Sequence, residues 1–473
     1  MLDIALLREN PDWVKEQIGK LNDPDALARV DRVVELDRRR RELLAEAESI
    51  QAARNRMNKN IGRLRGDKRL DDVTRSAVAR EATAAIEAGD YERAALVMEG
   101  KASVNQSVPG DDVDAGMDAL MAALKRVGER VESLNRDLEA VEGELNETML
   151  WLPNLPHETV PVFDSEEYNR PGPVHGEMPE FDFEPKPHWE LGPALDIIDF
   201  ERGVKLMGSR GYVLKGMGAR LQRALISFFL DMAREKGFTE LYVPYLVKEE
   251  AMYGSAQFPK FRDVVYFDPD ADLYLLPTAE VAITNLHRDE ILDEAQLPLY
   301  YVAHTPCFRR EKMSAGRDVR GIKRVHQFEK VEMYKFTTPE TSYDELETLV
   351  EAAEDICRAL RIPYRRLEIV SGDLGFSASK KYDVEMWAPG VGEWLEVSSC
   401  SNTEAFQARR ANIRYRPEGQ KRTRFVHTLN GSGLATPRVV IAILENYQQA
   451  DGSVVVPEVL RPYLGGLEII QKA

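Results

Sequence analysis

The sequence predicts an α+β protein in which an antiparallel β-sheet is flanked by helices and preceded by an antiparallel α-helical coiled-coil arm. Two heptad seams of apolar residues occupy the amino-terminal part of the 473-residue chain. Apolar strand-like runs separated by Pro and Gly, with the helical runs segregated from them, fill the rest, which favours an α+β fold over a doubly wound one. No phosphate-binding G-x-x-x-x-G-K-[ST] run and no dinucleotide-binding glycine pattern is present.

Composition narrows the class of protein. With 43% hydrophobic and 30% charged residues the chain reads as globular, and its length suggests two or more domains. No apolar run approaches the ~18 residues of a membrane span, and the charged amino-terminal segment does not resemble a signal peptide. The net charge of −17 argues against non-specific nucleic-acid binding over the whole surface. The three cysteines are far apart in the sequence, so we expect neither a metal site nor disulfides, and a cytoplasmic location.

The amino-terminal elements are helical. A short amphipathic helix is expected over 2–21, closed by Asn22-Asp23-Pro24. A first heptad seam then runs from Val33 to Leu64 and includes two arginines, and a second, more uniformly apolar seam runs from Leu120 to Leu145. A lone helix cannot bury such a seam, so the two helices are expected to pair as an antiparallel hairpin.

The far end of the first arm helix is basic, with almost no acidic residue in the run. Such a run is either a solvated helix face or a surface for RNA phosphates. Residues 66–113 form an insertion at the tip, with helices expected at 73–88 and 91–99, and have no assigned chemical role. The candidate nucleic-acid-contacting residues on the arm are Arg54, Arg56, Lys59, Arg63 and Arg65.

The chain divides into three predicted parts. Residues 1–152 form the amino-terminal domain with the arm, 153–187 form a Pro/Gly-rich linker, and 188–473 form the carboxy-terminal domain. Strands of the carboxy-terminal domain are expected to include the apolar runs 241–245, 299–303, 331–336 and 394–399.

The most informative run is Cys307-Phe308-Arg309-Arg310-Glu311, followed by a small, flexible loop and by His326-Gln327-Phe328-Glu329-Lys330-Val331-Glu332. It predicts a strand, a loop and a returning strand. An arginine at position 309 can clamp a phosphate, Glu311 can accept a hydrogen bond from an exocyclic amine, and Phe328 can stack on a base. For Arg309 taken alone, the alternative is a surface hairpin with ordinary ion pairs.

This run resembles motif 2 of class II aminoacyl-tRNA synthetases, and its sequence is similar to that of the seryl-tRNA synthetase family in particular. Other segments extend the resemblance over almost the whole chain. Thr278-Ala279-Glu280 resembles the family's serine-binding loop, and 396–402 with 406–410 resemble the stretch that binds ATP and magnesium. Segments 428–438 and 442–446 resemble motif 3, while 218–244 is placed like motif 1 at the dimer interface, and the helical hairpin is similar to the tRNA-binding arm.

The resemblance implies a role for each matching position. Arg309, Glu396 and Arg438 would be catalytic, with Glu396 and Ser399 holding Mg²⁺, and the loop 314–320, including Arg317, would meet the tRNA acceptor end. The implied ATP-binding residues are Arg309, Arg310, Glu311, Phe328, Glu396, Val397, Ser398, Ser399 and Arg438. The implied serine-binding residues are Thr278, Ala279, Glu280, Arg309, Glu332 and Ser432.

The implied activity is that of a homodimeric serine–tRNA ligase, which uses ATP to charge tRNA(Ser), with tRNA(Sec) left open as a second substrate. Two other readings compete: a catalytically silent RNA- or protein-binding homologue, and a ligase that loads a carrier protein. The intact set of charged site residues argues against the first, and the full arm argues against the second. The tip insertion and Lys312-Met313, where small residues are usual, depart from the family's pattern.

Overall fold

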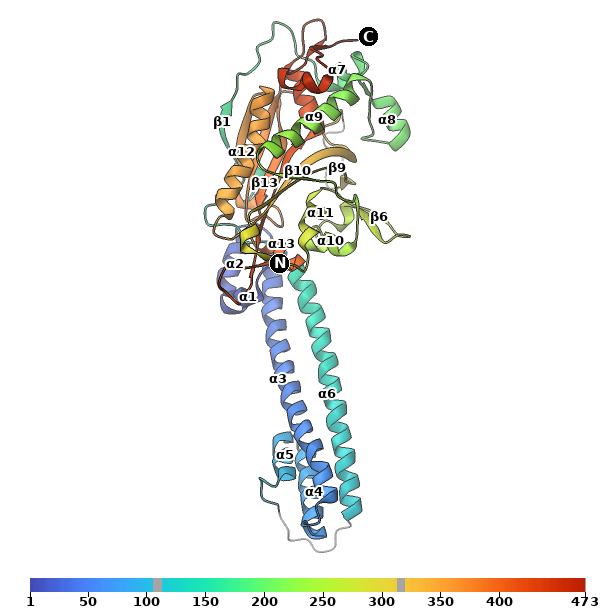
Figure 1. The fold of residues 1–473 in the computed structure, drawn as a ribbon, viewed down its shortest axis with the longest axis vertical. Helices are drawn as coiled ribbons and strands as arrows, with labels where there is room; N and C mark the ends of the chain where they lie inside the picture. The colour runs from blue at the N-terminus through green and yellow to red at the C-terminus, as the bar shows by residue number, and fades with distance from the viewer. Residues whose placement is uncertain (105–112, 313–319, 473) are drawn as a thin grey trace. The chain divides into compact units, whose positions relative to one another are not determined.

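The computed structural model describes residues 1–104, 113–312 and 320–472, which form two compact units (Figure 1). One unit is Ala28–Met149; the other combines Met1–Leu27 with Leu150–Ala473. Residues 1–27 join the second unit because the Met1 amine donates to the Phe406 carbonyl and Asp3 pairs with Arg409 at 2.9 Å. The predicted division of the chain into 1–152, 153–187 and 188–473 stays a prediction.

The expected single helix over 2–21 is wrong, since the structure has two helices there. Helix α1 (Ile4–Glu9) ends at Asn10, and α2 (Pro11–Gly19) begins at the next residue. Pro11 lacks a backbone N–H and is well suited to a first helical turn but not to a helix interior, so the chain breaks at that point.

The arm consists of two long helices, α3 (Pro24–Gly66) and α6 (Val113–Leu150), which lie side by side in Figure 1. Ion pairs Arg32–Glu144 at 2.5 Å and Arg130–Glu46 at 2.6 Å join them, and rising numbers on one helix meet falling numbers on the other. The pairing is therefore antiparallel, as the two seams predicted. Buried seam residues include Leu43, Ile50, Met57, Leu64, Leu120, Leu124, Val127, Val131 and Leu134.

The tip insertion forms α4 (Asp72–Glu87) and α5 (Tyr91–Glu99), close to the two helices predicted there. Each begins with an aspartate cap: Asp71 accepts from the Thr74 N–H, and Asp90 accepts from the Arg93 N–H. Their small apolar faces share one core with α3 and α6. The insertion is thus an integral part of the arm's packing.

The second unit is built on an antiparallel sheet whose described strands are ordered β1-β11-β12-β13-β16-β10-β9-β4. Within the described part of this sheet, only the β4–β9 pairing is parallel. The expected strands at 299–303, 331–336 and 394–399 all belong to it, while the run 241–245 contributes only its first residue to β4. The strands are β1 (Arg170–His175), β4 (Thr239–Leu241), β9 (Leu299–Phe308), β10 (Gln327–Thr337), β11 (Tyr364–Glu368), β12 (Lys380–Ala388), β13 (Glu393–Asn402) and β16 (His427–Ala435).

The two faces of the sheet have different partners. Successive side chains of a strand point to opposite faces, so β10 serves both. Its Val331 and Met333 join the main core with helices α9 (Met217–Glu235), α12 (Ser342–Leu360) and α14 (Thr436–Asn446). Its Tyr334 packs on the other face against α11 (Glu280–Thr284) and α13 (Phe406–Ala411). Lys330 and Glu332 share this second face with Tyr334.

Smaller elements complete the second unit. Three more helices are α7 (His188–Ala194), α8 (Phe200–Met207) and α10 (Glu249–Gly254). Short strands form separate small sheets: β2 (Ile198–Asp199), β3 (Val213–Leu214), β5 (Leu246–Val247), β6 (Tyr266–Asp268), β7 (Leu273–Leu275), β8 (Ile291–Asp293), β14 (Arg414–Arg416), β15 (Arg424–Phe425), β17 (Val454–Val455) and β18 (Ile469–Ile470).

Candidate active site

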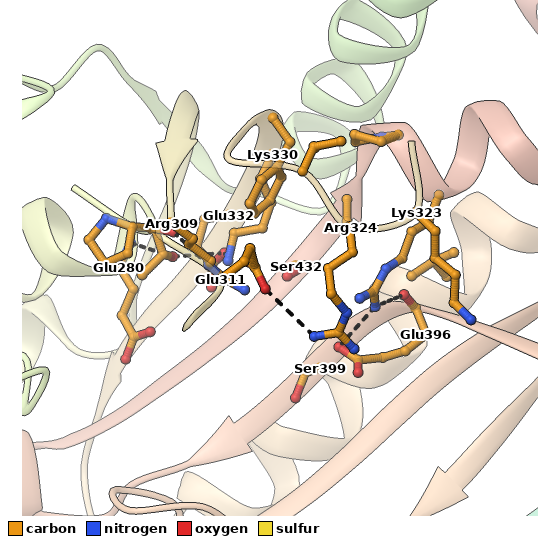
Figure 2. Close-up of a pocket in the computed structure, with 18 of the residues that line it drawn as sticks. Glu280, Arg309, Glu311, Lys323, Arg324, Lys330, Glu332, Glu396, Ser399 and Ser432 are labelled. Carbon is orange, nitrogen blue, oxygen red and sulfur yellow. Dashed lines mark hydrogen bonds and ion pairs between the residues drawn. The ribbon is translucent and has the colours of Figure 1, made fainter. Parts of the chain in front are cut away.

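A cavity of about 470 Å³ opens on the face of the sheet that carries Glu332. Figure 2 shows acidic and basic side chains converging on it from β10, β13, β16 and the loops beside them. The cavity brings together residues that lie far apart along the chain and that the sequence analysis assigned to one site. The predicted residues lining the cavity are Thr278, Glu280, Arg309, Glu311, Phe328, Glu332, Glu396, Val397, Ser399, Ser432 and Arg438.

Arg309 follows directly after β9 and is held by the returning strand. Its N–H donates to the His326 carbonyl, and the His326 ring lies 3.0 Å from the Arg309 carbonyl oxygen. The guanidinium lies 5.1 Å from the centre of the Phe328 ring. The predicted strand–loop–strand hairpin therefore presents Arg309 and Phe328 together. His326 thus holds the backbone of Arg309 through two hydrogen bonds.

Two carboxylates stand at one end of the cavity. Glu332 is 1% exposed and pairs with Lys330 at 2.5 Å, while the Thr278 hydroxyl donates to it at 3.4 Å. Burial, followed by repulsion from Glu332, raises the pKa of Glu280 to about 7. Ser432 lies opposite Glu332 in the β10–β16 register. This end offers two acidic groups and two hydroxyls, a set suited to an ammonium and a hydroxyl of one small ligand.

A β-bulge shapes the other end. In the β12–β13 register Asp383 faces Ser399 and Glu385 faces Glu396, which leaves an extra residue on β13 between them. In a regular strand Glu396 and Ser399 would point to opposite faces, but the bulge brings both to the cavity. Arg438 donates to the Glu396 carbonyl at 2.5 Å and lies 3.6 Å from its carboxylate.

The charge state of Glu396 follows from these neighbours. Desolvation acts to raise its pKa, but Arg438, Lys381 and Arg309 outweigh it and hold the pKa of Glu396 below its ordinary value. A carboxylate that stays ionised beside a hydroxyl supplies the oxygen ligands that Mg²⁺ prefers. No cluster of three or more His, Cys, Asp or Glu suited to a metal occurs within residues 1–104, 113–312 and 320–472.

Three predicted ligands do not line the cavity. Ala279 is fully buried in the core beneath it. Arg310 points elsewhere, with its guanidinium 5.3 Å from the centre of the Tyr266 ring. Ser398 is buried and donates to the Ser432 carbonyl at 2.6 Å, which ties β13 to β16. Ala279 and Ser398 pack behind the cavity, Arg310 faces away from it, and the roles of all three as ligands stay predictions.

Sequence reasoning missed several residues of the site. Lys330 neutralises Glu332, and Arg324 reaches Glu311 at 3.7 Å, the ion pair drawn as a dashed line in Figure 2. Asn430 also lines the cavity and donates to Glu280 at 3.3 Å. Lys330 and Glu332 are two residues apart on β10 and therefore share a face, a spacing that could have indicated their ion pair. The position of Arg324 depends on a loop conformation that no sequence pattern predicts.

A buried histidine–carboxylate pair anchors the segment around Ile322, which leads from the hairpin loop into β10. His188, 1% exposed, has its Nδ1 2.9 Å from Glu445, and its Nε2 accepts from the Ile322 N–H at 3.1 Å. Glu445 also accepts from the Gly390 N–H at 2.9 Å. A Cβ at Gly321, where φ is +72°, would lie 1.9 Å from His188 Nε2, so this position requires glycine.

The predicted RNA-contacting residues of the arm separate into two groups. Arg54 packs across Gly128 of α6, and Arg56 pairs with Glu99 at 2.8 Å and Glu92 at 2.7 Å. Arg63 donates to the Met98 carbonyl at 2.6 Å. Lys59 and Arg65 are exposed, and no ion pair joins either to another residue of the described arm. Arg317 and most of the loop 314–320 lie outside the described residues.

Cys307, Cys357 and Cys400 are free and buried, and burial raises the pKa of each thiol, in Cys400 to about 12. They are packed thiols. His427 is likewise structural, with its ring 2.9 Å from the Ser342 hydroxyl and its pKa lowered to about 4 by burial. No helix in the described ranges has the length and apolar character to cross a bilayer.

Comparison with known proteins decides the family. Residues 1–97 match the family model of the seryl-tRNA synthetase N-terminal domain, and 264–447 match that of the class II tRNA synthetase core domain (G, H, P, S and T). The chain is 56% identical over its whole length, and over all of the relative's, to the serine–tRNA ligase of Roseiflexus sp. (strain RS-1). The chain belongs to the seryl-tRNA synthetase family.

Other members of the seryl-tRNA synthetase family agree with this placement. The serine–tRNA ligase of Chloroflexus aurantiacus is 49% identical over 470 residues, covering 99% of this chain and 100% of the relative. The seryl-tRNA synthetase of Pyrococcus horikoshii, solved with ATP, superposes with a TM-score of 0.85 at 36% identity over both full chains. The cytoplasmic enzyme of Naegleria fowleri, solved with AMP, gives 0.79 at 30% identity, covering 100% of this chain and 99% of the other. The predicted fold and the predicted class of aminoacyl-tRNA ligase are confirmed.

Proposed function

We propose that this member of the seryl-tRNA synthetase family activates L-serine with ATP to form seryl-adenylate and then transfers the seryl group to tRNA(Ser). The observation that carries the proposal is the single cavity that combines Glu280 and Glu332 at one end with Glu396 and Arg438 at the other, with Arg309 facing both. Acidic groups suit the substrate ammonium, and the arginines suit phosphate oxygens. The relative from Pyrococcus horikoshii was solved with ATP, which supports the nucleotide assignment.

The chemistry needs positioning more than covalent help. A serine carboxylate oxygen attacks the α-phosphorus in line; the new P–O bond forms as the bond to the bridging oxygen breaks, and diphosphate leaves with the electron pair. Arg309 and Arg438 neutralise the charge that builds on the phosphate oxygens. In the second step a terminal ribose hydroxyl of tRNA attacks the seryl carbonyl, and AMP leaves, its phosphate able to take the hydroxyl proton.

Mg²⁺ fits the residues present. Glu396 is held ionised, the bulge on β13 places Ser399 on the same face, and the Asp383 Oδ1 atom nearby is buried without a hydrogen-bond partner among the described residues. We assign Glu396 and Ser399 as the protein's ligands to Mg²⁺ bound with ATP. The ion would neutralise phosphate charge when bound.

Selectivity for serine follows from buried polar groups. We assign the carboxylate of Glu332 and the hydroxyl of Ser432 as partners of the serine hydroxyl, and alanine would leave them without that partner. A site of this kind rejects an analogue lacking the hydroxyl by ~10⁴–10⁵. Threonine must be excluded by the shape of the pocket instead.

The decisive experiment is amino-acid-dependent ATP–diphosphate exchange with serine, threonine, alanine and glycine side by side, with Mg²⁺ present. Exchange with serine alone is the expected result. Exchange with none of the four by a folded protein would refute the ligase and favour the silent homologue. Charging assays with tRNA(Ser), tRNA(Sec) and a carrier protein then identify the acceptor.

The arm is proposed to bind tRNA. Deletion of 28–149, which is one compact unit, should leave serine-dependent exchange intact and abolish tRNA charging. Charging that survives the deletion would contradict the role of the arm. The exposed Lys59 and Arg65 are the best-placed phosphate contacts of the predicted set, because Arg56 and Arg63 are engaged within the arm.

We further propose a homodimer formed through the segment 218–244. Tyr242, 88% exposed, directly follows β4, the edge strand of the large sheet, and Leu246, 47% exposed, lies four residues further on in β5. Apolar side chains beside an unpaired sheet edge suit a second copy of the chain. The buried free cysteines are consistent with a reducing cytoplasm. Light scattering after size exclusion tests the dimer.

A further inference from the structure

Gln407 is a fully buried amide on α13 whose side chain reaches the amino-acid end of the cavity from behind. Its Nε2 lies 2.6 Å from a carboxylate oxygen of Glu280 and 3.1 Å from the Ser255 carbonyl oxygen. Its Oε1 accepts from the hydroxyls of Thr428 at 2.8 Å and Tyr334 at 2.9 Å. The resemblance grouped 406–410 with the residues that bind ATP and magnesium, but these contacts point to the amino acid.

The orientation of the amide is fixed by chemistry. The Ser255 carbonyl oxygen can only accept, as can the ionised form of Glu280, so the NH₂ group of Gln407 must face Ser255 and with it Glu280. The oxygen then faces these two hydroxyls and that of Thr403, which donates at 3.3 Å, and the Tyr334 hydroxyl accepts in turn from Thr284 at 2.8 Å. Every polar atom of the side chain thus has a partner, which holds the amide in one position.

This amide determines how Glu280 faces the cavity. Gln407 donates to one carboxylate oxygen, and Asn430 donates to the other at 3.3 Å. Two donors from different elements fix the plane of the carboxylate. The charged groups facing Glu280 are Glu332 and Lys330 of β10 and Arg309 after β9.

We propose that Gln407 is a positioning residue for the amino-acid substrate: it holds Glu280 in the orientation that meets the substrate ammonium, and so sets the KM for serine without touching ATP. The assignment of Glu280 as the ammonium ligand rests on the proposed function. The contact with Gln407 also lowers the pKa of Glu280 against the effects of burial and Glu332, which keeps more of the carboxylate ionised at neutral pH.

The test is Gln407→Met, which keeps side-chain length and removes the donor, in serine-dependent ATP–diphosphate exchange. The KM for serine should rise about tenfold or more, as loss of a hydrogen bond to a charged group implies, with the KM for ATP within about twofold of wild type. The acid limb of kcat/KM for serine should move to higher pH. The matched control is Gln448→Met, another buried glutamine, which bonds Lys186 and the Glu445 carbonyl away from the cavity.

A second pair of variants tests the proposal if Gln407→Met does not fold. Tyr334→Phe removes a hydroxyl that holds Gln407, whereas Tyr343→Phe removes one that bonds Glu404 at 2.6 Å. Tyr334→Phe should raise the KM for serine several-fold, and Tyr343→Phe should not.

The outcomes separate this proposal from the function on which it rests. Equal rises in the KM for serine and for ATP, or an unchanged KM for serine in a folded Gln407→Met protein, would overturn the role of Gln407. Absence of serine-dependent exchange in the wild-type protein would instead overturn the proposed function.

Discussion

Replacement of Glu332 by Gln probes the serine pocket most directly. The substitution keeps the shape of a side chain that is 1% exposed and removes its charge. Lys330, 2.5 Å away, then faces an amide, and the Thr278 hydroxyl loses an ionised acceptor. Glu280 also loses the neighbour whose repulsion helps to raise its pKa to about 7.

Two magnitudes follow from these contacts. A hydrogen bond to a charged group contributes about 2 kcal/mol, so the kcat/KM for serine should fall about thirtyfold at pH 8. The KM for ATP should change by less than about twofold, because Arg309 and Arg438 keep their places. Loss of one partner of a buried ion pair destabilises a protein by about 3 kcal/mol, so the melting temperature should fall as well.

The pH profile gives a signature that misfolding cannot produce. Glu280 must be ionised to attract an ammonium, so kcat/KM for serine falls as the pH drops through its pKa. Without Glu332 that pKa decreases, and the acid limb should move below the wild-type position near pH 7.

ATP–diphosphate exchange at varied serine, ATP and pH measures all three effects. Glu329→Gln is the matched control, since Glu329 lies on the same strand but bonds His304 at 2.6 Å and does not line the cavity. Equal losses for serine and ATP in Glu332→Gln, or an acid limb that moves upward, would place Glu332 outside the serine pocket.

Three further predictions concern other parts of the molecule. Lys59→Glu with Arg65→Glu should raise the KM for tRNA at least about tenfold and reduce its salt dependence, with exchange unaffected; unchanged charging kinetics would exclude this face of the arm. His188→Ala removes the acceptor for the Ile322 N–H and should raise the KM for ATP several-fold in exchange assays, with a smaller effect on serine; a change in the KM for serine alone would count against it. Tyr242→Asp should give monomers in light scattering, and a persistent dimer would place the interface elsewhere.

Much of the fold could be predicted because it depends on periodic patterns. The heptad seams specify the arm, since each apolar face can be buried only against the other, and α4 and α5 begin at aspartates that the sequence displays. The break at Pro11 and the short β4 were missed because single residues and tertiary contacts set them. Patterns of burial are local, whereas the ends of elements depend on what packs beside them.

The site was predictable as a set of residue types and less so as a set of contacts. Resemblance brought together most of the residues that line the cavity, yet it gave no reason for Glu396 and Ser399 to share a face, because a spacing of three in a strand places side chains on opposite faces. The bulge in β13 supplies that reason and depends on pairing with β12. The arm shows the reverse case. Its basic run is partly neutralised, because Arg56 pairs with Glu92 and Glu99, which lie 36 and 43 residues further along the chain.

Glu280 connects these observations, because its charge is set by groups from several separate elements. Glu332 raises its pKa, and the donor on Gln407 lowers it. The variants Glu332→Gln and Gln407→Met should therefore move the acid limb for serine in opposite directions while both weaken serine binding. A general loss of structure would change both variants in the same way. Opposite displacements around pH 7 would identify Glu280 as the group that meets the serine ammonium, and displacements of the same sign would assign that role to another residue.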